Sequence, residues 1–155
     1  MNKYPNLNEL IKCHPYSEHT ICDHAQIEPE LLHAALDGTE VLTPTEIIAI
    51  ARLYGCPIGV LNDSKLIMLD MNRSRHRKMV NEVKSIYIQL KGMADEGNHD
   101  AVKYSEWADW EFRKFMYAVR SNKFSYCHYL GIKEQLTQYV SFAIPKPKRR
   151  GPAAI

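Results

Sequence analysis

The side chains best able to bind a metal or attack a substrate gather in residues 13–24, which contain Cys13, His14, His19, Cys22 and His24. His19 and Cys22 are three positions apart, so a helix would place both on one face, as it does for some zinc ligands. No two cysteines form a close Cys-x-x-Cys pair, however, and Cys22 falls where the helical pattern requires a small buried residue. A structural zinc is therefore the alternative, and reduced, buried thiols are the prediction. No metal and no cofactor is expected.

Motifs that activate a nucleophile or hold a phosphate are missing from the sequence. It has no nucleophile elbow, no glycine loop that could cradle phosphates and no helix with paired metal-binding histidines. The seven histidines are scattered, and most are expected at exposed positions of helices. The sequence therefore indicates a binding protein, not an enzyme, with no catalytic residues.

Charge is distributed unevenly along the 155 residues. Residues 1–64 have three basic and nine acidic side chains, a net charge of −6, whereas residues 65–155 have 17 basic and nine acidic, a net charge of +8. Such asymmetry indicates different partners or roles for the two halves. The candidates for contacts with phosphate groups form two basic clusters: Arg73, Arg75, Arg77 and Lys78, and then Lys146, Lys148, Arg149 and Arg150.

Apolar spacing predicts five short helices in the first half. The first covers residues 6–14 and ends before Pro15, because the residue before proline avoids helical geometry. Ser17 is the expected N-cap of the second, and the third covers residues 28–36 with Gly38 as its C-cap. A capping box beginning at Thr43 opens the fourth, and a brief fifth helix follows at residues 57–61.

Three longer helices are expected in the second half, at about residues 76–97, 104–121 and 125–142. The predicted fold class is all-α: a five-helix repressor-like helix-turn-helix domain (1–64), a linker (65–75), a small helical bundle (76–143) and a disordered basic tail (144–155). Whether residues 66–70 form a strand is left open. The bundle is rich in aromatic residues, which favour interface cores, so we expect a homodimer with five candidate interface residues: Trp107, Trp110, Phe115, Tyr126 and Tyr129.

Neither a signal peptide nor a membrane-spanning segment is expected. Residues 1–8 are polar and contain Pro5, unlike the apolar core of a signal peptide. The longest apolar stretches, at residues 47–50 and 66–69, are far shorter than a membrane span. We therefore expect a cytoplasmic protein with no membrane partner.

Residues 7–61 resemble the lambda-repressor-like (Cro and xenobiotic-response-element) helix-turn-helix family. The family has glycine at the end of its third helix, as at Gly38, and an Ala-x-x-x-Gly pattern near its end, as at Ala51 and Gly55, followed by Leu61. Its apolar positions correspond to Tyr16, Ile21, Ala25, Ile27, Leu32 and Ala35. The resemblance implies that the third helix enters the major groove of double-stranded DNA and that the start of the second contacts phosphate.

The residues that would contact DNA depart from the family. Gln26 replaces the usual turn glycine, and Glu18 replaces a usual glutamine. No lysine or arginine lies between Lys12 and Arg52. The candidate DNA-binding or partner-binding residues are therefore mostly acidic or neutral: Ser17, Glu18, Glu28, Glu30, His33 and Ala34.

Two functions are compatible with this pattern. The first is a DNA-binding transcriptional regulator of prophage or mobile-element type that binds an operator. The alternative is a phage inhibitor of the anti-CRISPR kind, which retains the repressor-like scaffold and uses its acidic surface to bind a basic partner, such as a nuclease. An acidic surface suits a basic protein better than it suits DNA.

Overall fold

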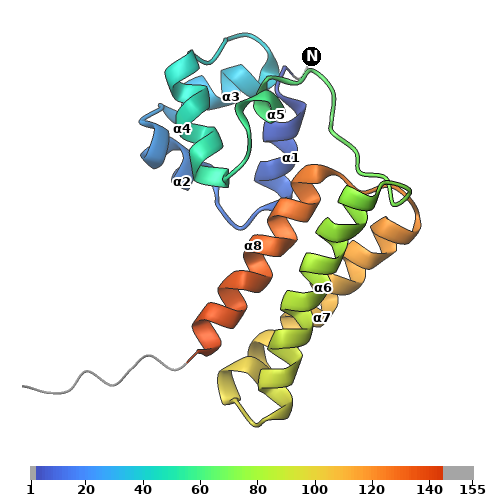
Figure 1. The fold of residues 1–155 in the computed structure, drawn as a ribbon. Helices are drawn as coiled ribbons and strands as arrows, with labels where there is room; N and C mark the ends of the chain where they lie inside the picture. Colours follow the sequence, from blue (N-terminus) through green and yellow to red (C-terminus); the bar gives the residue numbers. More distant parts are fainter. Residues whose placement is uncertain (1–2, 145–155) are drawn as a thin grey trace, which may run out of the picture.

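The computed structural model describes residues 3–144, and the regular secondary structure of this part of the chain is all helix, without a strand. Five short helices are followed by three long ones, and Figure 1 shows the short helices grouped beyond one end of the long ones. The all-α prediction is confirmed. The helices are α1 (Pro5–Cys13), α2 (Glu18–Ala25), α3 (Pro29–Asp37), α4 (Pro44–Tyr54), α5 (Ile58–Asn62), α6 (Ser74–Asp95), α7 (His99–Arg120) and α8 (Tyr126–Ala143).

The short helices begin and end at residues that satisfy free backbone groups. Ser17 caps α2 by accepting a hydrogen bond from the Thr20 N–H. Thr43 and Glu46 form the expected capping box at the start of α4. Gly38 ends α3 in the left-handed conformation, with φ of 87°. Local sequence therefore determines where these helices start and stop.

One hydrophobic core unites the five short helices. Each helix contributes at least one buried apolar side chain, and helices this short depend on such packing because they are marginal in isolation. The core also contains Cys127, which belongs to α8. Its largest fully buried side chains are Leu7, Leu10, Ile21, Leu32, Ile50 and Leu61.

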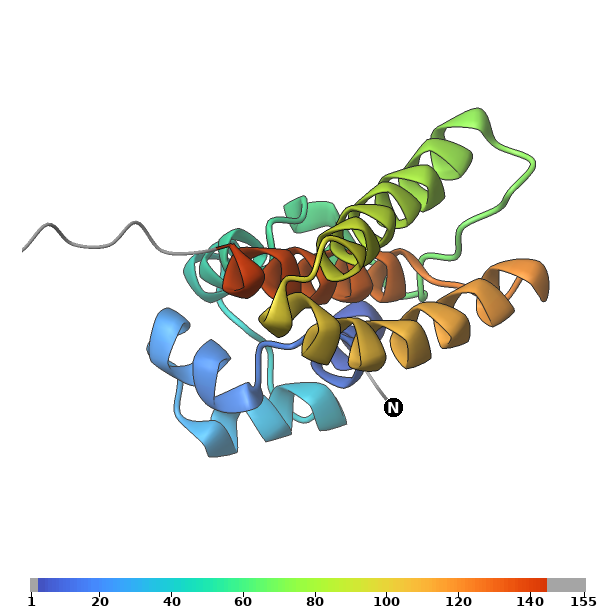
Figure 2. The same cartoon turned by 90° about the horizontal axis from the view of Figure 1, so that it is seen from below.

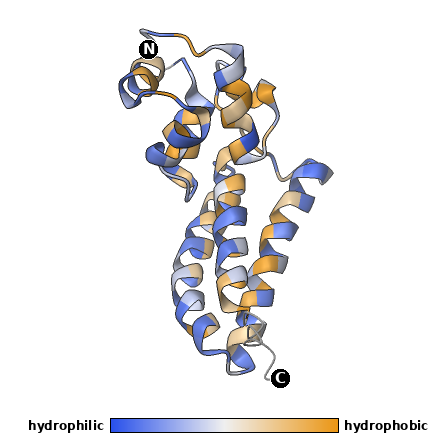
Figure 3. Cartoon of the chain, turned by 90° about the vertical axis from the view of Figure 1, so that its left-hand side faces the viewer, coloured by the Kyte–Doolittle hydropathy of each residue, from blue (hydrophilic) through white to orange (hydrophobic). Residues whose placement is uncertain are grey.

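A second core lies between the three long helices, each of which packs against the other two. Hydrophobic and hydrophilic residues alternate along each of them (Figure 3), as expected for helices with one buried side. Helix α7 begins at His99, earlier than the predicted residue 104, because the Asn98 side chain accepts a hydrogen bond from the Ala101 N–H. Leu90, Phe115 and Leu136 are among the fully buried side chains.

The segment between α5 and α6 is extended but closely packed. The Asn6 side chain donates to the Lys65 carbonyl (2.8 Å) and accepts from the Ile67 N–H (2.9 Å). Met68 forms an isolated antiparallel bridge with Ser125, so residues 66–70 are not a strand. The segment therefore connects the two cores through specific hydrogen bonds.

Helices α1 and α8 make the direct contact between the two groups of helices. The Cys127 thiol donates to the Asn6 carbonyl oxygen at 3.3 Å. A Cβ atom at Gly131 would lie 2.3 Å from the Cys13 carbonyl oxygen, so only glycine allows this approach. The two cores therefore meet at a tight backbone contact.

Candidate functional site

Helices α2 and α3 are joined by a turn of three residues, Gln26, Ile27 and Glu28. Gln26 adopts the left-handed conformation (φ 54°, ψ 50°), which favours glycine. Ile27 is buried in the first core and anchors the turn, while Glu28 is the N-cap of α3 without a side-chain capping bond. The turn therefore has the left-handed backbone conformation that is typical of glycine, although the residue there is glutamine.

The surface formed by α2 and α3 is acidic. Glu18 Oε2 lies 2.7 Å from His33 Nε2, which links the two helices, and this hydrogen bond raises the pKa of His33. Glu28 and Glu30 are exposed, and Ala34 is half-buried beside them. The structure therefore brings two of the candidate binding residues, Glu18 and His33, into contact, with Ser17 at the start of α2.

The basic cluster at residues 73–78 lies elsewhere. Arg73 is the N-cap of α6, and Arg75, Arg77 and Lys78 are exposed in its first turns. Figure 2 shows α3 and the start of α6 on opposite sides of the molecule. A duplex docked on α3 would thus not reach this cluster directly. The second predicted cluster, Lys146, Lys148, Arg149 and Arg150, lies outside the described residues.

The histidines and cysteines of residues 13–24 are not gathered at one point. Over residues 3–144, no group of three or more His, Cys, Asp or Glu side chains is placed to hold a metal. Cys22 is a buried free thiol, as predicted, and Cys13 is half-buried. Four of the seven histidines are exposed, in line with the prediction for most of them, and His14 is an exception: it packs against Tyr16 and Tyr54, and burial lowers its pKa to about 4.

Two of the five predicted dimer-interface residues are buried within the chain. Phe115 is 0% exposed and Tyr129 5% exposed, because both point into the second core. Tyr126 is half-buried and packs against both cores. Trp107 and Trp110 are exposed, at 50% and 62%. Only the two tryptophans therefore lie on a surface that a partner could reach.

The two tryptophans, which the sequence predicted as interface residues, belong to a larger surface whose basic members were not predicted, here called the α7 face. It consists of side chains three or four positions apart, which are neighbours on one side of a helix. The available signal was the spacing of Lys103 and Lys114 on either side of the two tryptophans, followed by Tyr117, which is 74% exposed. The α7 face comprises Lys103, Trp107, Trp110, Arg113, Lys114 and Tyr117.

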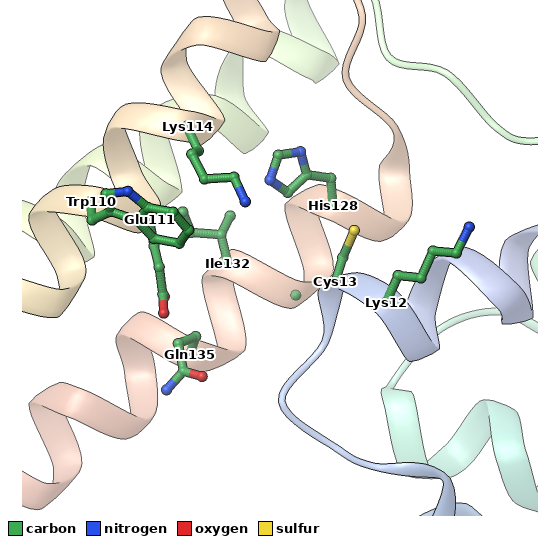
Figure 4. Close-up of a pocket in the computed structure, with 9 residues that line it drawn as sticks. Lys12, Cys13, Trp110, Glu111, Lys114, His128, Ile132 and Gln135 are labelled. Atoms are coloured by element: carbon green, nitrogen blue, oxygen red, sulfur yellow. The ribbon is translucent and has the colours of Figure 1, made fainter.

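A pocket of about 210 Å³ continues from the α7 face to the contact between α1 and α8. Trp110 and Lys114 of α7 line one side, His128 of α8 the centre and Lys12 and Cys13 of α1 the other side. Figure 4 shows Lys114 reaching toward His128, with Cys13 beyond it. Side chains from α1, α7 and α8 therefore converge on this opening.

The cysteine and histidine in this pocket are not arranged as a nucleophile and base. Burial raises the pKa of Cys13 to about 12, and its thiol donates to Glu9 Oε1 at 3.3 Å. Burial also lowers the pKa of His128. A protonated thiol is a weak nucleophile, so this pocket is better suited to binding than to covalent chemistry.

Comparisons with known proteins add no relative to this description. No family model, no curated protein and no solved structure matches the chain. Among the described residues, no helix has the length and apolar character needed to cross a membrane.

Proposed function

We propose that this chain is a DNA-binding transcriptional regulator of prophage or mobile-element type, with residues 1–64 as a repressor-like helix-turn-helix domain. The observation that carries the proposal is the α2–turn–α3 unit. Gln26 holds the left-handed conformation at the turn position where the family has glycine, and Ile27 anchors the turn in the core. Two helices joined by such a short turn are the motif that places a recognition helix in the major groove.

In this proposal α3 is the recognition helix. Glu28 and Glu30 lie at its exposed N-terminal end, where carboxylates could accept hydrogen bonds from cytosine N4. Ser17 lies at the start of α2, where backbone N–H groups can contact a phosphate. His33 would be held toward the groove by its hydrogen bond to Glu18.

A second candidate is favoured by the charge of the same surface. Residues 1–64 have a net charge of −6, and α2 and α3 contain neither lysine nor arginine. Affinity for DNA depends largely on cations that contact phosphates, whereas an acidic surface attracts a basic protein. The alternative proposal is therefore a phage inhibitor that binds a basic, nucleic-acid-binding protein through Glu18, Glu28 and Glu30.

Selection from random double-stranded DNA, followed by fluorescence anisotropy, tests the first proposal. We expect the full chain to enrich one sequence. The double variant E28Q/E30Q should change the preferred base at one or more positions, because an amide pairs with adenine where a carboxylate accepts from cytosine. Exposed Asp95 and Glu96, at the end of α6, provide a control variant (D95N/E96Q) that removes the same charge far from α3.

The outcomes separate the two candidates. A regulator enriches a sequence, E28Q/E30Q alters the preference and D95N/E96Q does not. If no sequence is enriched, but poly-lysine binds in a salt-sensitive manner that E28Q/E30Q weakens, the second candidate is supported. If the double variant changes neither DNA nor poly-lysine binding, both proposals lose the α2–α3 surface as their site.

A further inference from the structure

We propose that the α7 face binds single-stranded nucleic acid, at a site separate from α3. Proteins that bind single strands without strong sequence preference combine aromatic rings, on which bases stack, with cations that follow the phosphate backbone. The α7 face has both: three exposed aromatic rings and three cations arranged along one helix.

The exposed rings of the α7 face are held in place. Trp107 packs against Tyr104 and Tyr139, with centroid distances of 5.8 and 6.2 Å. Lys114 Nζ lies 4.5 Å from the centroid of the Trp110 ring, and Lys103 Nζ lies 5.5 Å from that of Trp107. Because these contacts already restrict the indoles, little side-chain freedom is lost when a base stacks on them.

The positive charge of the α7 face favours the binding of an anion. Arg113, Lys114 and Lys103 are exposed, and Arg120 extends the positive charge one turn beyond Tyr117. Two of the four acidic residues of α7 are already paired: Asp109 bonds to Tyr87 and Lys91, and Glu111 accepts from Tyr139 and is partly buried. The other two, Asp100 and Glu106, are exposed, so four exposed cations of α7 stand against two exposed acids.

The surface is also hollowed where the aromatic and basic groups meet. A shallow depression of about 400 Å³ is lined by Trp110, Arg113, Lys114 and Tyr117. Trp110 and Lys114 also line the adjoining pocket at the contact of α1 with α8, whose far side carries Lys12. A strand lying along α7 would therefore find cations on both sides of Trp110.

Other occupants fit the α7 face less well. A symmetric dimer through this face would bring two copies of the same surface together and so gather the lysines and arginines of both copies in one interface. A duplex would offer phosphates but no free base faces, so the exposed rings would gain nothing from it. An acidic polypeptide would satisfy the cations but would not use the aromatic faces for base stacking.

The chain has two tryptophans, and both belong to this face, so intrinsic fluorescence reports on it directly. Titration of the full chain with poly-dT of about 16 nucleotides, the upper range for one binding unit, should quench this fluorescence. Binding should weaken as salt rises. A duplex of the same length should bind at least about tenfold more weakly and quench little.

Single substitutions test whether poly-dT binds at the α7 face. W110A should weaken poly-dT binding about tenfold or more, because stacking on one ring contributes that much. K114Q should lower the salt dependence by about one phosphate contact, about 0.7 in the log–log slope for a single strand. Exposed Ile88 of α6 and exposed Lys3, which precedes α1, provide the matched controls I88A and K3Q, which should leave binding unchanged.

Four results would overturn the proposal. One is poly-dT binding that W110A leaves unchanged, which would place the site elsewhere. Another is equal or greater quenching by poly-glutamate, which would indicate an acidic protein partner. The third is a dimer that W110A converts to a monomer in sedimentation, and the fourth is no binding of poly-dT. The variant E28Q/E30Q should not affect poly-dT binding, so failure here is distinguishable from failure of the α3 proposal.

Discussion

The two helical regions use their polar side chains in different ways. Among the short helices α1–α5, polar groups mainly close helix ends, as Ser17 and Thr43 do. Among the long helices, polar groups connect one helix to another: Tyr129 donates to Glu82 at 2.7 Å, and Tyr139 to Glu111 at 3.1 Å. Short helices have many ends for their length, so local capping matters most there. Long helices need contacts that determine how they align with one another.

Charge separates the same two regions. The short helices carry the acidic surface of α2 and α3, whereas the long helices carry the basic α7 face and the cluster at residues 73–78. Within the long helices, the two acids bonded to tyrosines differ from each other: hydrogen bonds from Tyr129 and Lys133 lower the pKa of Glu82, whereas burial raises the pKa of Glu111. This separation of charge matches the second candidate function, in which the acidic surface binds a basic protein, together with the proposal that the α7 face binds single-stranded nucleic acid.

The largest expected effect concerns which aromatic residues form the second core. Phe115→Ala should lower the free energy of unfolding by about 3–5 kcal/mol, because it removes a fully buried ring. Trp110→Ala, at an exposed position of the same helix, should change it by only about 0.5 kcal/mol. Urea unfolding monitored by circular dichroism measures both. Equal effects would contradict the orientation of α7.

The contact between the two regions provides the next test. Gly131→Ala should lower the free energy of unfolding by about 1–3 kcal/mol, because the added Cβ would overlap the Cys13 backbone. Gly92, in α6, has open space around it. Gly92→Ala should therefore raise stability by about 0.5–1 kcal/mol. A Gly131→Ala variant as stable as the wild type would show that α1 and α8 do not approach so closely.

A pH-dependent effect is expected from His14. Its pKa is lowered by burial from 6.5 to about 4, so the folded state favours the neutral ring. The stabilisation this gives is complete above pH 6.5 and is lost as the pH falls toward 4. Between pH 7 and pH 5 the wild type should lose about 2 kcal/mol more than His14→Gln.

Urea unfolding at the two pH values measures this difference, and an NMR titration of the histidine rings provides an independent check. His14 should titrate below pH 6.5, and exposed His33, which is bonded to Glu18, should titrate above it. Parallel pH profiles of the wild type and His14→Gln would mean that His14 is not buried in solution.

The smallest expected effects come from removing the hydroxyl group of one tyrosine in each core. Tyr54 Oη is buried without a hydrogen-bond partner among the described residues, whereas the hydroxyl of Tyr129 bonds to Glu82. Tyr54→Phe should therefore raise the free energy of unfolding by about 1 kcal/mol, and Tyr129→Phe should lower it by a similar amount. Chemical denaturation of the two variants checks the signs. Loss of stability in Tyr54→Phe would reveal a hydrogen bond to its hydroxyl.

Local signals explain why much of the fold could be predicted. The capping box at Thr43, the proline after His14 and the glycine after Asp37 each act within a few residues, so the helix ends nearby were expected close to where they lie. The aromatic residues of α7 were less informative. Apolar side chains occupy nearly its whole circumference, so the periodicity could not separate buried Phe115 from exposed Trp110.

The sequence by itself determined the all-helical character, most helix ends and the separation of charge, because these depend on side-chain type and on neighbours along the chain. Tertiary structure alone decided which face of α7 is exposed, that His14 is buried and that Gly131 meets Cys13. It also decided that Asn6 contacts Cys127, 121 positions away. Such contacts depend on how distant helices pack, and a side chain's burial follows from the partner that covers it, which no local pattern encodes.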